Sequence, residues 1–182
     1  MRKIALVSAL LLLAGVSAFA ENLPNYAALK LGGYFPMASD VEDFDNGFYG
    51  ELALGHYFSP NFAAELGVGY TTTSDNFLFA DFDLTIIPVT VGVKGSLPMG
   101  IFEPYAMAGL GAYFTELESI HDSSSENDTA FGYYLGLGAN FNITKSFLLG
   151  LEGKYFWAEP NFAGEDVKVD GITATFNIGY RF

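Results

Sequence analysis

The chain has 182 residues, with 21 acidic against 8 basic side chains and a formal net charge of −13. A chain this acidic repels phosphate backbones, so we exclude nucleic acid as a partner. It contains no cysteine, which excludes both a disulfide framework and attachment through a lipidated N-terminal cysteine.

The first twenty residues are typical of a secretory signal peptide. Met1-Arg2-Lys3 supplies the charged start, and Ala18-Phe19-Ala20 forms a small-residue cleavage site. Residues 4–16 are apolar but too short to span a bilayer as a helix. We therefore assign residues 1–20 to a signal peptide and residues 21–182 to a single domain, because domains usually have about 100 to 200 residues.

Eight segments of this domain alternate apolar and polar side chains, which is the period of a strand with two different faces. In chain order they cover residues 27–35, 48–58, 62–70, 89–97, 106–114, 131–141, 147–157 and 171–182. In the fourth segment the apolar phase shifts between Ile86 and Val89, on either side of Pro88. Because proline cannot donate to a ladder, this shift predicts a β-bulge.

The connections between these segments alternate in length. Residues 59–61, 98–103 and 142–146 are short connections, whereas residues 36–46, 72–83, 115–129 and 158–170 are long ones. This pattern predicts an all-β fold, an eight-stranded antiparallel up-and-down transmembrane β-barrel. The short turns and both termini should lie on the periplasmic side.

Alternation alone also fits a soluble eight-stranded carrier barrel with its apolar face inside, and side-chain volume decides between the two. The polar face is rich in glycine, whereas the apolar face carries leucine, valine and phenylalanine. The interior of an eight-stranded barrel is only just wide enough for side chains to fill, so we expect the glycine-rich face inside. Aromatic residues at both ends of the apolar segments then predict two girdles at the membrane interfaces.

The polar face also carries most of the domain's cations, each of which would cost about 2 to 4 kcal/mol on the lipid face near the midplane. We predict a lumen charge network made of Lys30, Glu51, Glu65, Lys94, Glu152, Lys154 and Arg181. Counting from the strand ends places Lys30 level with Glu51. It also places Glu65 level with Lys94. Glu152 and Lys154 should close the network with Arg181.

Together with inward tyrosines, these charges are expected to plug the lumen, because water-filled channels belong to barrels of about 16 strands or more. The tyrosines concerned are Tyr26, Tyr34, Tyr49, Tyr57, Tyr105, Tyr113 and Tyr134. The alternative is a narrow gated path for ions or protons.

Sixteen carboxylates fall in the four long connections, where only Lys168 opposes them. Solvated acidic loops are the ordinary interpretation, and binding of divalent cations is the sharper one. Asp40, Asp43 and Asp45 are weak candidates for a calcium or magnesium site, because Leu54 occupies the position where a calcium loop needs a bidentate glutamate. No other metal site and no cofactor is expected.

His56 and His121 are the candidates for acid–base catalysis. His121 stands beside Ser123 and Glu126 in a Ser- and Asp-rich loop, which cannot hold catalytic geometry without ordering. His56 should face lipid near the periplasmic girdle, where an amphipathic ring serves as an interface anchor. We therefore expect no enzymatic activity.

Three segments carry a resemblance to a known family: Ile87-Pro-Val-Thr-Val-Gly-Val-Lys94, Glu103-Pro-Tyr-Ala-Met-Ala-Gly-Leu-Gly-Ala-Tyr113 and Asn177-Ile-Gly-Tyr-Arg-Phe182. Through them, residues 21–182 resemble the small OmpA-like and OmpW-like outer-membrane barrels of the porin family. The resemblance implies a location in the bacterial outer membrane. It also implies that the terminal strand carries an assembly signal, formed by Phe176, Ile178, Tyr180 and Phe182.

The same resemblance implies a set of partners. The barrel-assembly machinery and periplasmic chaperones are expected during export, and outer-membrane lipid and lipopolysaccharide afterwards. Because the chain stops at the last strand, we expect no peptidoglycan-binding domain.

Three functions remain open from the sequence. The first is a non-enzymatic envelope protein whose barrel anchors exposed acidic loops for surface interaction and outer-membrane integrity. The second is an OmpW-like narrow channel for small or hydrophobic molecules, for which the inward Met107 and Phe156 are the sequence hints. The third and least favoured is a lipid A-modifying enzyme.

Overall fold

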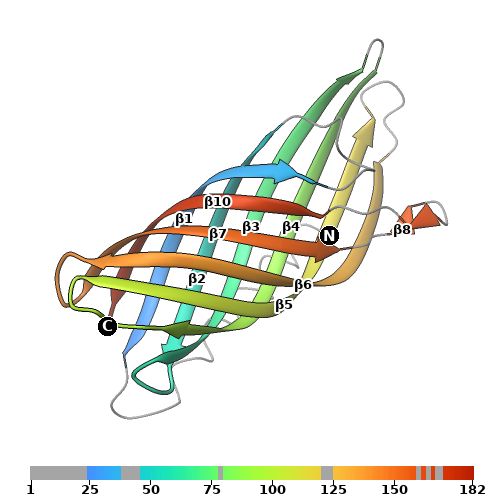
Figure 1. The fold of residues 1–182 in the computed structure, drawn as a ribbon. Helices are drawn as coiled ribbons and strands as arrows, with labels where there is room; N and C mark the ends of the chain where they lie inside the picture. The colour runs from blue at the N-terminus through green and yellow to red at the C-terminus, as the bar shows by residue number, and fades with distance from the viewer. Residues whose placement is uncertain are drawn as a thin grey trace.

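The computed structural model describes residues 24–37, 46–77, 80–119, 125–158, 161–162, 165–166 and 170–182. Within these ranges, eight strands close into an antiparallel barrel in the order β1-β10-β7-β6-β5-β4-β3-β2 (Figure 1). Their bounds are β1 (Asn25–Pro36), β2 (Gly47–Tyr57), β3 (Phe62–Phe77), β4 (Ala80–Ser96), β5 (Phe102–Ser119), β6 (Ser125–Asn142), β7 (Phe147–Ala158) and β10 (Gly171–Arg181). Each barrel strand pairs with the barrel strands before and after it, and β10 pairs with β1. The predicted eight-stranded up-and-down barrel is therefore confirmed.

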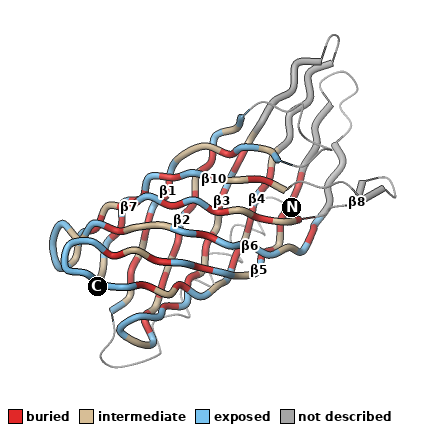
Figure 2. The backbone as a smooth tube through the Cα atoms, viewed as in Figure 1, coloured by how far each residue is buried: buried red, intermediate tan, exposed pale blue. Residues whose placement is uncertain are grey.

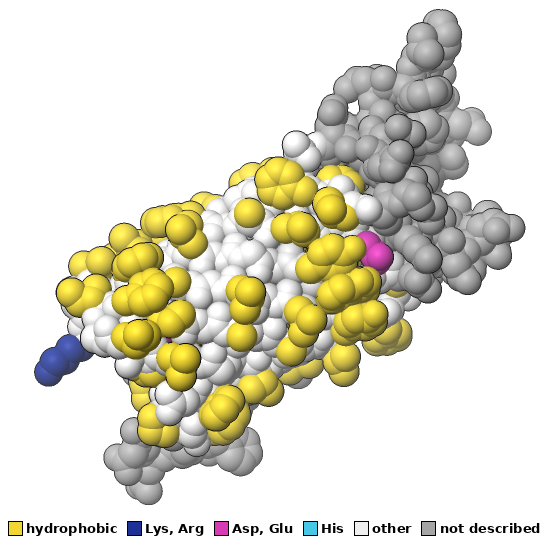
Figure 3. Space-filling view, viewed as in Figure 1, with side chains coloured by type: hydrophobic (Ala, Val, Ile, Leu, Met, Phe, Trp, Pro, Cys, Tyr) yellow, Lys and Arg dark blue, Asp and Glu magenta, His cyan; other side chains and the backbone are white. Residues whose placement is uncertain are grey.

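Side chains alternate between the wall and the interior along each strand (Figure 2). Leu52 is 66 % exposed and Leu135 is 55 % exposed, whereas their chain neighbours Glu51 and Tyr134 are both 2 % exposed. The face of the wall seen in Figure 3 is hydrophobic, with charged side chains only toward its two ends. All seven tyrosines expected to point inward are buried. The predicted orientation, with the bulky apolar face outward, is confirmed.

Two of the long connections are shorter than the sequence indicated. Residues 72–83 and 115–129 were predicted to be loops, but β3 continues to Phe77, β4 begins at Ala80, β5 continues to Ser119 and β6 begins at Ser125. The prediction was wrong because it depended on alternating apolar residues, which lipid selects, whereas ladder hydrogen bonds need only the backbone. In Figure 1 the β3–β4 hairpin extends beyond the barrel at the end opposite the short turns.

The connection after β7 also contains structure that was not predicted. Two short strands, β8 (Asn161–Phe162) and β9 (Glu165–Asp166), pair antiparallel within residues 158–170. The predicted signal peptide, residues 1–20, lies outside the described residues and stays a prediction.

No bulge forms at Pro88, contrary to the prediction. Val68 pairs with Val89 and Thr71 pairs with Ile86, so β3 and β4 keep one register across the proline. Pairing with β3 is interrupted only opposite Ile87 and Pro88, as expected for a residue without an N–H. The apparent phase shift arises because Ile86 points into the interior, where it is 1 % exposed.

The glycine-rich lining makes room for the inward rings. A Cβ added at Gly138 would lie 2.4 Å from Cζ of Tyr105, which is closer than packed atoms can approach. On the lipid side, the nearest atom to a Cβ at Gly153 would be the carbonyl oxygen of Thr173, at 3.9 Å.

We therefore expect Gly138→Val to destabilise the barrel by about 1 to 3 kcal/mol, because an overpacked interior must displace the Tyr105 ring. Gly153→Val is the matched control and should leave stability nearly unchanged. Urea unfolding in detergent micelles, followed by heat-modifiable gel mobility, measures both variants. Equal midpoints for the two variants would contradict this assignment of faces.

Candidate functional site: an ionic cluster in the lumen

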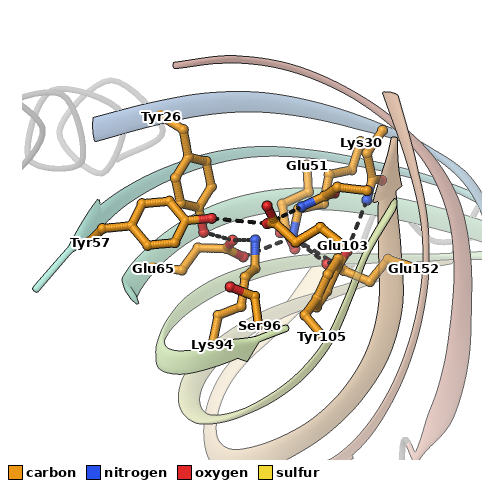
Figure 4. Close-up of polar contacts among 12 residues, drawn as sticks. Tyr26, Lys30, Glu51, Tyr57, Glu65, Lys94, Ser96, Glu103, Tyr105 and Glu152 are labelled. Carbon is orange, nitrogen blue, oxygen red and sulfur yellow. Dashed lines mark hydrogen bonds and ion pairs between the residues drawn. The ribbon is translucent and has the colours of Figure 1, made fainter. Parts of the chain in front are cut away.

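Six charged side chains from five strands meet in the middle of the barrel (Figure 4). They are Lys30 of β1, Glu51 of β2, Glu65 of β3, Lys94 of β4, and Glu152 and Lys154 of β7. All six occupy inward positions of the alternation and are buried. We call this group the ionic cluster.

Lys30 lies at the centre of the ionic cluster. Its Nζ atom lies 2.8 Å from Oε1 of Glu65 and 2.9 Å from Oε1 of Glu51. The same Nζ atom lies 2.9 Å from Oε1 of Glu152 and donates hydrogen bonds to both oxygens of that carboxylate. One ammonium group therefore binds carboxylates from three other strands.

The other two lysines balance the remaining charge. Nζ of Lys94 lies 2.8 Å from Oε2 of Glu65. Nζ of Lys154 lies 2.6 Å from Oε2 of Glu51 and 3.4 Å from Oε1 of Glu152. Three ammonium groups thus face three carboxylates, so the cluster is formally neutral. Neutrality matters because an unpaired charge in this environment would cost several kcal/mol.

Each glutamate of the cluster also accepts a hydrogen bond from a tyrosine hydroxyl. The pairs are Tyr26 with Glu65, Tyr49 with Glu51, and Tyr105 with Glu152. Nζ of Lys94 lies 4.4 Å from the ring centroid of Tyr26 and 4.6 Å from that of Tyr105, within the range of cation–π attraction. The phenols therefore provide polar partners to buried charges of both signs.

The structure brings the predicted partners together, with one register difference. Lys30 and Glu51 are direct cross-strand neighbours, as counted from the sequence. Lys94 instead faces Ala63, two residues from Glu65, and its long side chain spans the offset. Counting from strand ends ignores the stagger between neighbouring strands that closure of a barrel imposes.

Arg181 does not join the ionic cluster, which corrects the predicted closure through Glu152 and Lys154. Its Nη2 atom lies 2.8 Å from Oε2 and 2.9 Å from Oε1 of Glu103, near the periplasmic end of the lumen. The same nitrogen donates to the hydroxyl of Tyr57. Arg181 and Glu103 therefore form a second, separate pair.

Glu103 was missed because it was assigned to the short turn 98–103. Its carboxylate is buried and also accepts hydrogen bonds from Asn140 and Asn142. The alternation could have revealed it. Glu103 is two residues from the inward Tyr105, so in an extended strand both side chains lie on the same face of β5.

The lumen is open toward the periplasmic turns and narrow above them. A vestibule of about 550 Å³ is lined by the short turns together with Pro24, Glu103 and Arg181. Between this vestibule and the ionic cluster lies a cavity of about 10 Å³, lined partly by Tyr57, Lys94 and Asn177. A space of that size holds about one water molecule.

The other predicted candidates are a loop metal site and two histidines. Among the described residues, no group of three or more histidine and carboxylate side chains could hold a metal ion. Asp40, Asp43 and Asp45 lie outside the described residues, as does His121. Nδ1 of His56 lies 2.8 Å from the amide oxygen of Asn25, at the periplasmic end of the wall.

Residues 6–182 match the family model described as outer membrane protein beta-barrel domain. A protein of Rickettsia conorii that is named as a candidate adhesin is 27 % identical over 169 residues. The match covers 80 % of this chain, and the chain spans 65 % of the length of that relative.

Solved outer-membrane barrels share the fold. Neisserial surface protein A is 15 % identical with a TM-score of 0.62, and the match covers 88 % of this chain and 97 % of that one. The attachment invasion locus protein of Yersinia pestis, solved with the heparin analogue sucrose octasulfate, is 18 % identical with a TM-score of 0.62. That match covers 89 % of this chain and all of the other. OprG of Pseudomonas aeruginosa is 16 % identical with a TM-score of 0.62, and the match covers 88 % and 94 %.

The central position of Lys30 gives a direct test of the cluster. Lys30→Met leaves three buried carboxylates with two lysines, so we expect a loss of about 3 to 5 kcal/mol in stability. Adding Glu65→Gln restores neutrality and should recover part of that loss. Lys145→Met, in an exposed turn, is the control and should change stability by less than about 0.5 kcal/mol. Urea unfolding of the reconstituted protein provides the measurement, and strictly additive losses in the double variant would argue against charge balance.

Proposed function

The chain belongs to the outer membrane protein beta-barrel domain family, and on this premise we propose that it is a non-enzymatic surface protein of the bacterial outer membrane. Its barrel anchors an acidic outer sheet that interacts with external partners, and its lumen is closed. The observation that carries the proposal is the projecting part of strands β3 to β6.

This projecting part is a sheet that continues after the rest of the barrel has ended. Pairing between β2 and β3 stops at Phe48 with Thr72, and pairing between β6 and β7 stops at Gly132 with Ala158. Pairing among β3, β4, β5 and β6 continues beyond both points. We call residues 73–77, 80–85, 115–119 and 125–129 the outer sheet.

The outer sheet is strongly acidic. Its carboxylates are Asp75, Asp81, Asp83, Glu116, Glu118, Glu126 and Asp128, and its four segments contain no lysine, arginine or histidine. Cross-strand pairing places Asp83 level with Glu118. Like charges held at this spacing repel each other, and a cationic partner relieves the repulsion. We infer that the outer sheet binds cationic surfaces.

The comparisons support an attachment role of this kind. The relative from Rickettsia conorii is named as a candidate adhesin. The Yersinia pestis barrel was solved with a polyanionic sugar analogue, but the acidic outer sheet of this chain suits partners of the opposite charge. Divalent cations at the acidic loops would serve the same purpose by bridging to lipopolysaccharide.

The contents of the lumen support an anchoring role over diffusion. The ionic cluster and the rings around it fill the cross-section, so the charged residues serve the stability of the barrel. No metal or prosthetic group is needed for this role, and no residue is assigned to catalysis.

A narrow channel for hydrophobic molecules remains the second candidate, because one observation favours it. Ile86, Met107 and Phe156 are buried in one apolar cluster with lumen tyrosines, and Met107 lies level with Lys94. These side chains fill the space that a ligand would need, so we rank the channel below the anchor.

The terminal strand fits a role in assembly. Phe176, Ile178 and Tyr180 face outward from β10, Phe182 directly follows that strand, and the four side chains are 41 to 65 % exposed. An outward row of apolar side chains ending in phenylalanine is accessible to the barrel-assembly machinery and its chaperones before it meets lipid. We propose these four residues as the assembly signal.

Charge removal in the outer sheet tests the proposed function. The purified barrel in zwitterionic detergent should bind immobilised poly-lysine, with an affinity that falls as salt rises. The combined variant Asp81→Asn, Asp83→Asn, Glu116→Gln, Glu118→Gln should bind roughly tenfold more weakly, at about 0.3 to 0.5 kcal/mol for each charge removed. Biolayer interferometry measures both affinities.

The control keeps the charge and changes the same segments. Ser119→Asn with Asn127→Ser should bind poly-lysine as the wild type does, and neither protein should bind immobilised heparin. Unchanged poly-lysine affinity in the amide variant would remove the outer sheet as the interacting surface.

A further inference from the structure

Three aromatic rings stack across the outer half of the lumen. The ring centroid of Phe156 lies 5.5 Å from that of Tyr34 and 5.3 Å from that of Tyr113. The plane of the Phe156 ring is inclined by 24° to that of Tyr34 and by 20° to that of Tyr113, so both tyrosines stack on Phe156. Their strands are β7, β1 and β5, which are spread around the barrel. We call these residues the ring stack.

Glycines in the barrel wall leave room for the rings of the stack. A Cβ added at Gly171 would lie 2.2 Å from Cε2 of Tyr34. A Cβ at Gly132 would lie 3.0 Å from Cε2 of Tyr113. Only glycine leaves space for rings this close to the backbone, so the stack is held in place by the wall itself.

Thr90, which is 7 % exposed, lies next to the ring stack in the lumen. A Cβ at Gly111 would meet both the Tyr113 ring and the methyl group of Thr90, at 3.0 and 3.1 Å. A Cβ at Gly67 would meet both the hydroxyl of Thr90 and the carboxylate of Glu51. Thr90 therefore lies between the ring stack and the ionic cluster.

The two ends of the lumen differ in character. On the periplasmic side, polar side chains line the vestibule and the small cavity. The small cavity borders Lys94 of the ionic cluster and the phenol of Tyr26. On the outer side the ring stack covers the cluster with apolar faces, and its members are at most 6 % exposed. Charged solutes cross an apolar layer of this kind at high cost, because they lose hydration without gaining partners.

We propose that the ring stack is the outer seal of the lumen, that Phe156 is its central element, and that the ionic cluster is accessible only from the periplasm. The seal acts independently of the ion pairs, which lie on its periplasmic side and stabilise the barrel. This inference rests on the closed lumen of the proposed function and identifies which side chains close it.

The absence of cysteine from the chain allows a clean accessibility test. Thr90→Cys introduces a single reporter thiol of similar size directly beneath the seal. Intact cells are treated from outside with a small methanethiosulfonate that carries an ammonium group, and labelling is read by mass spectrometry. With the ring stack intact, the thiol should be protected. In the Phe156→Ala background it should label at least roughly tenfold faster, because labelling follows the fraction of molecules with the thiol exposed.

Three further backgrounds separate the seal from other causes. Phe156→Tyr keeps the ring and should keep the protection. Leu151→Ala changes a lipid-facing residue of the same strand, and Lys94→Gln weakens the ionic cluster. Both variants should leave the thiol protected. Heat-modifiable gel mobility verifies that every variant is folded.

The outcomes that would overturn the inference are distinct from those that bear on the closed lumen. Labelling with the ring stack intact, protection that persists in folded Phe156→Ala, or rapid labelling in Lys94→Gln would each remove the ring stack as the seal. Current steps from the wild-type barrel in planar bilayers would contradict the closed lumen itself, whatever the labelling shows.

Discussion

The narrow interior of an eight-stranded barrel is the constraint on which the rest of this structure depends. Bulky side chains cannot all point inward, so the leucine, valine and phenylalanine positions must face outward, and lipid is the environment that accepts them. Glycine therefore occupies many inward positions, and several of these glycines make room for a ring from a neighbouring strand. Gly138 beneath the Tyr105 ring and Gly171 beneath the Tyr34 ring are two such sites.

This division of volume also explains why charge gathers at the axis. Lysine and glutamate side chains that cannot lie on the lipid face find one another across the lumen, and Lys30 binds carboxylates from three strands. A buried ion pair seldom adds stability over an apolar alternative, but breaking one is costly. The cluster therefore favours one register among the strands, since a slip of one residue would turn its members toward lipid.

The sequence was sufficient to predict the barrel, its orientation and the six residues of the ionic cluster, because all three follow from a period of two, but it wrongly added Arg181 to that network. Glu51 and Leu52 are adjacent, and their opposite polarity alone assigns each to its face. The errors arose where that signal ends or misleads. Ile86 is apolar but points inward, so it suggested a bulge that the register excludes. The outer parts of β3 to β6 pair through the backbone while most of their side chains are polar, so the pattern of apolar alternation did not indicate them.

The partner of Arg181 could not be predicted for a different reason. Pairing across a lumen depends on the height of each residue along the axis, and stagger between strands shifts that height. Glu103 stood at the edge of a turn, where assignment to turn or strand is least certain. The ring stack was partly visible, since Phe156 and the tyrosines were expected inside, but their mutual stacking depends on side-chain geometry that alternation does not encode.

The opposite faces of two adjacent residues provide the most direct test of this account. Trp157 is the single tryptophan of the chain, so a Trp157→Phe background allows one new tryptophan to report its surroundings. In bilayers of lipids brominated at mid-chain, the fluorescence of Leu135→Trp should be strongly quenched and that of Tyr134→Trp should not. Strong quenching of Tyr134→Trp with a bright Leu135→Trp would place the ionic face against lipid and contradict the account.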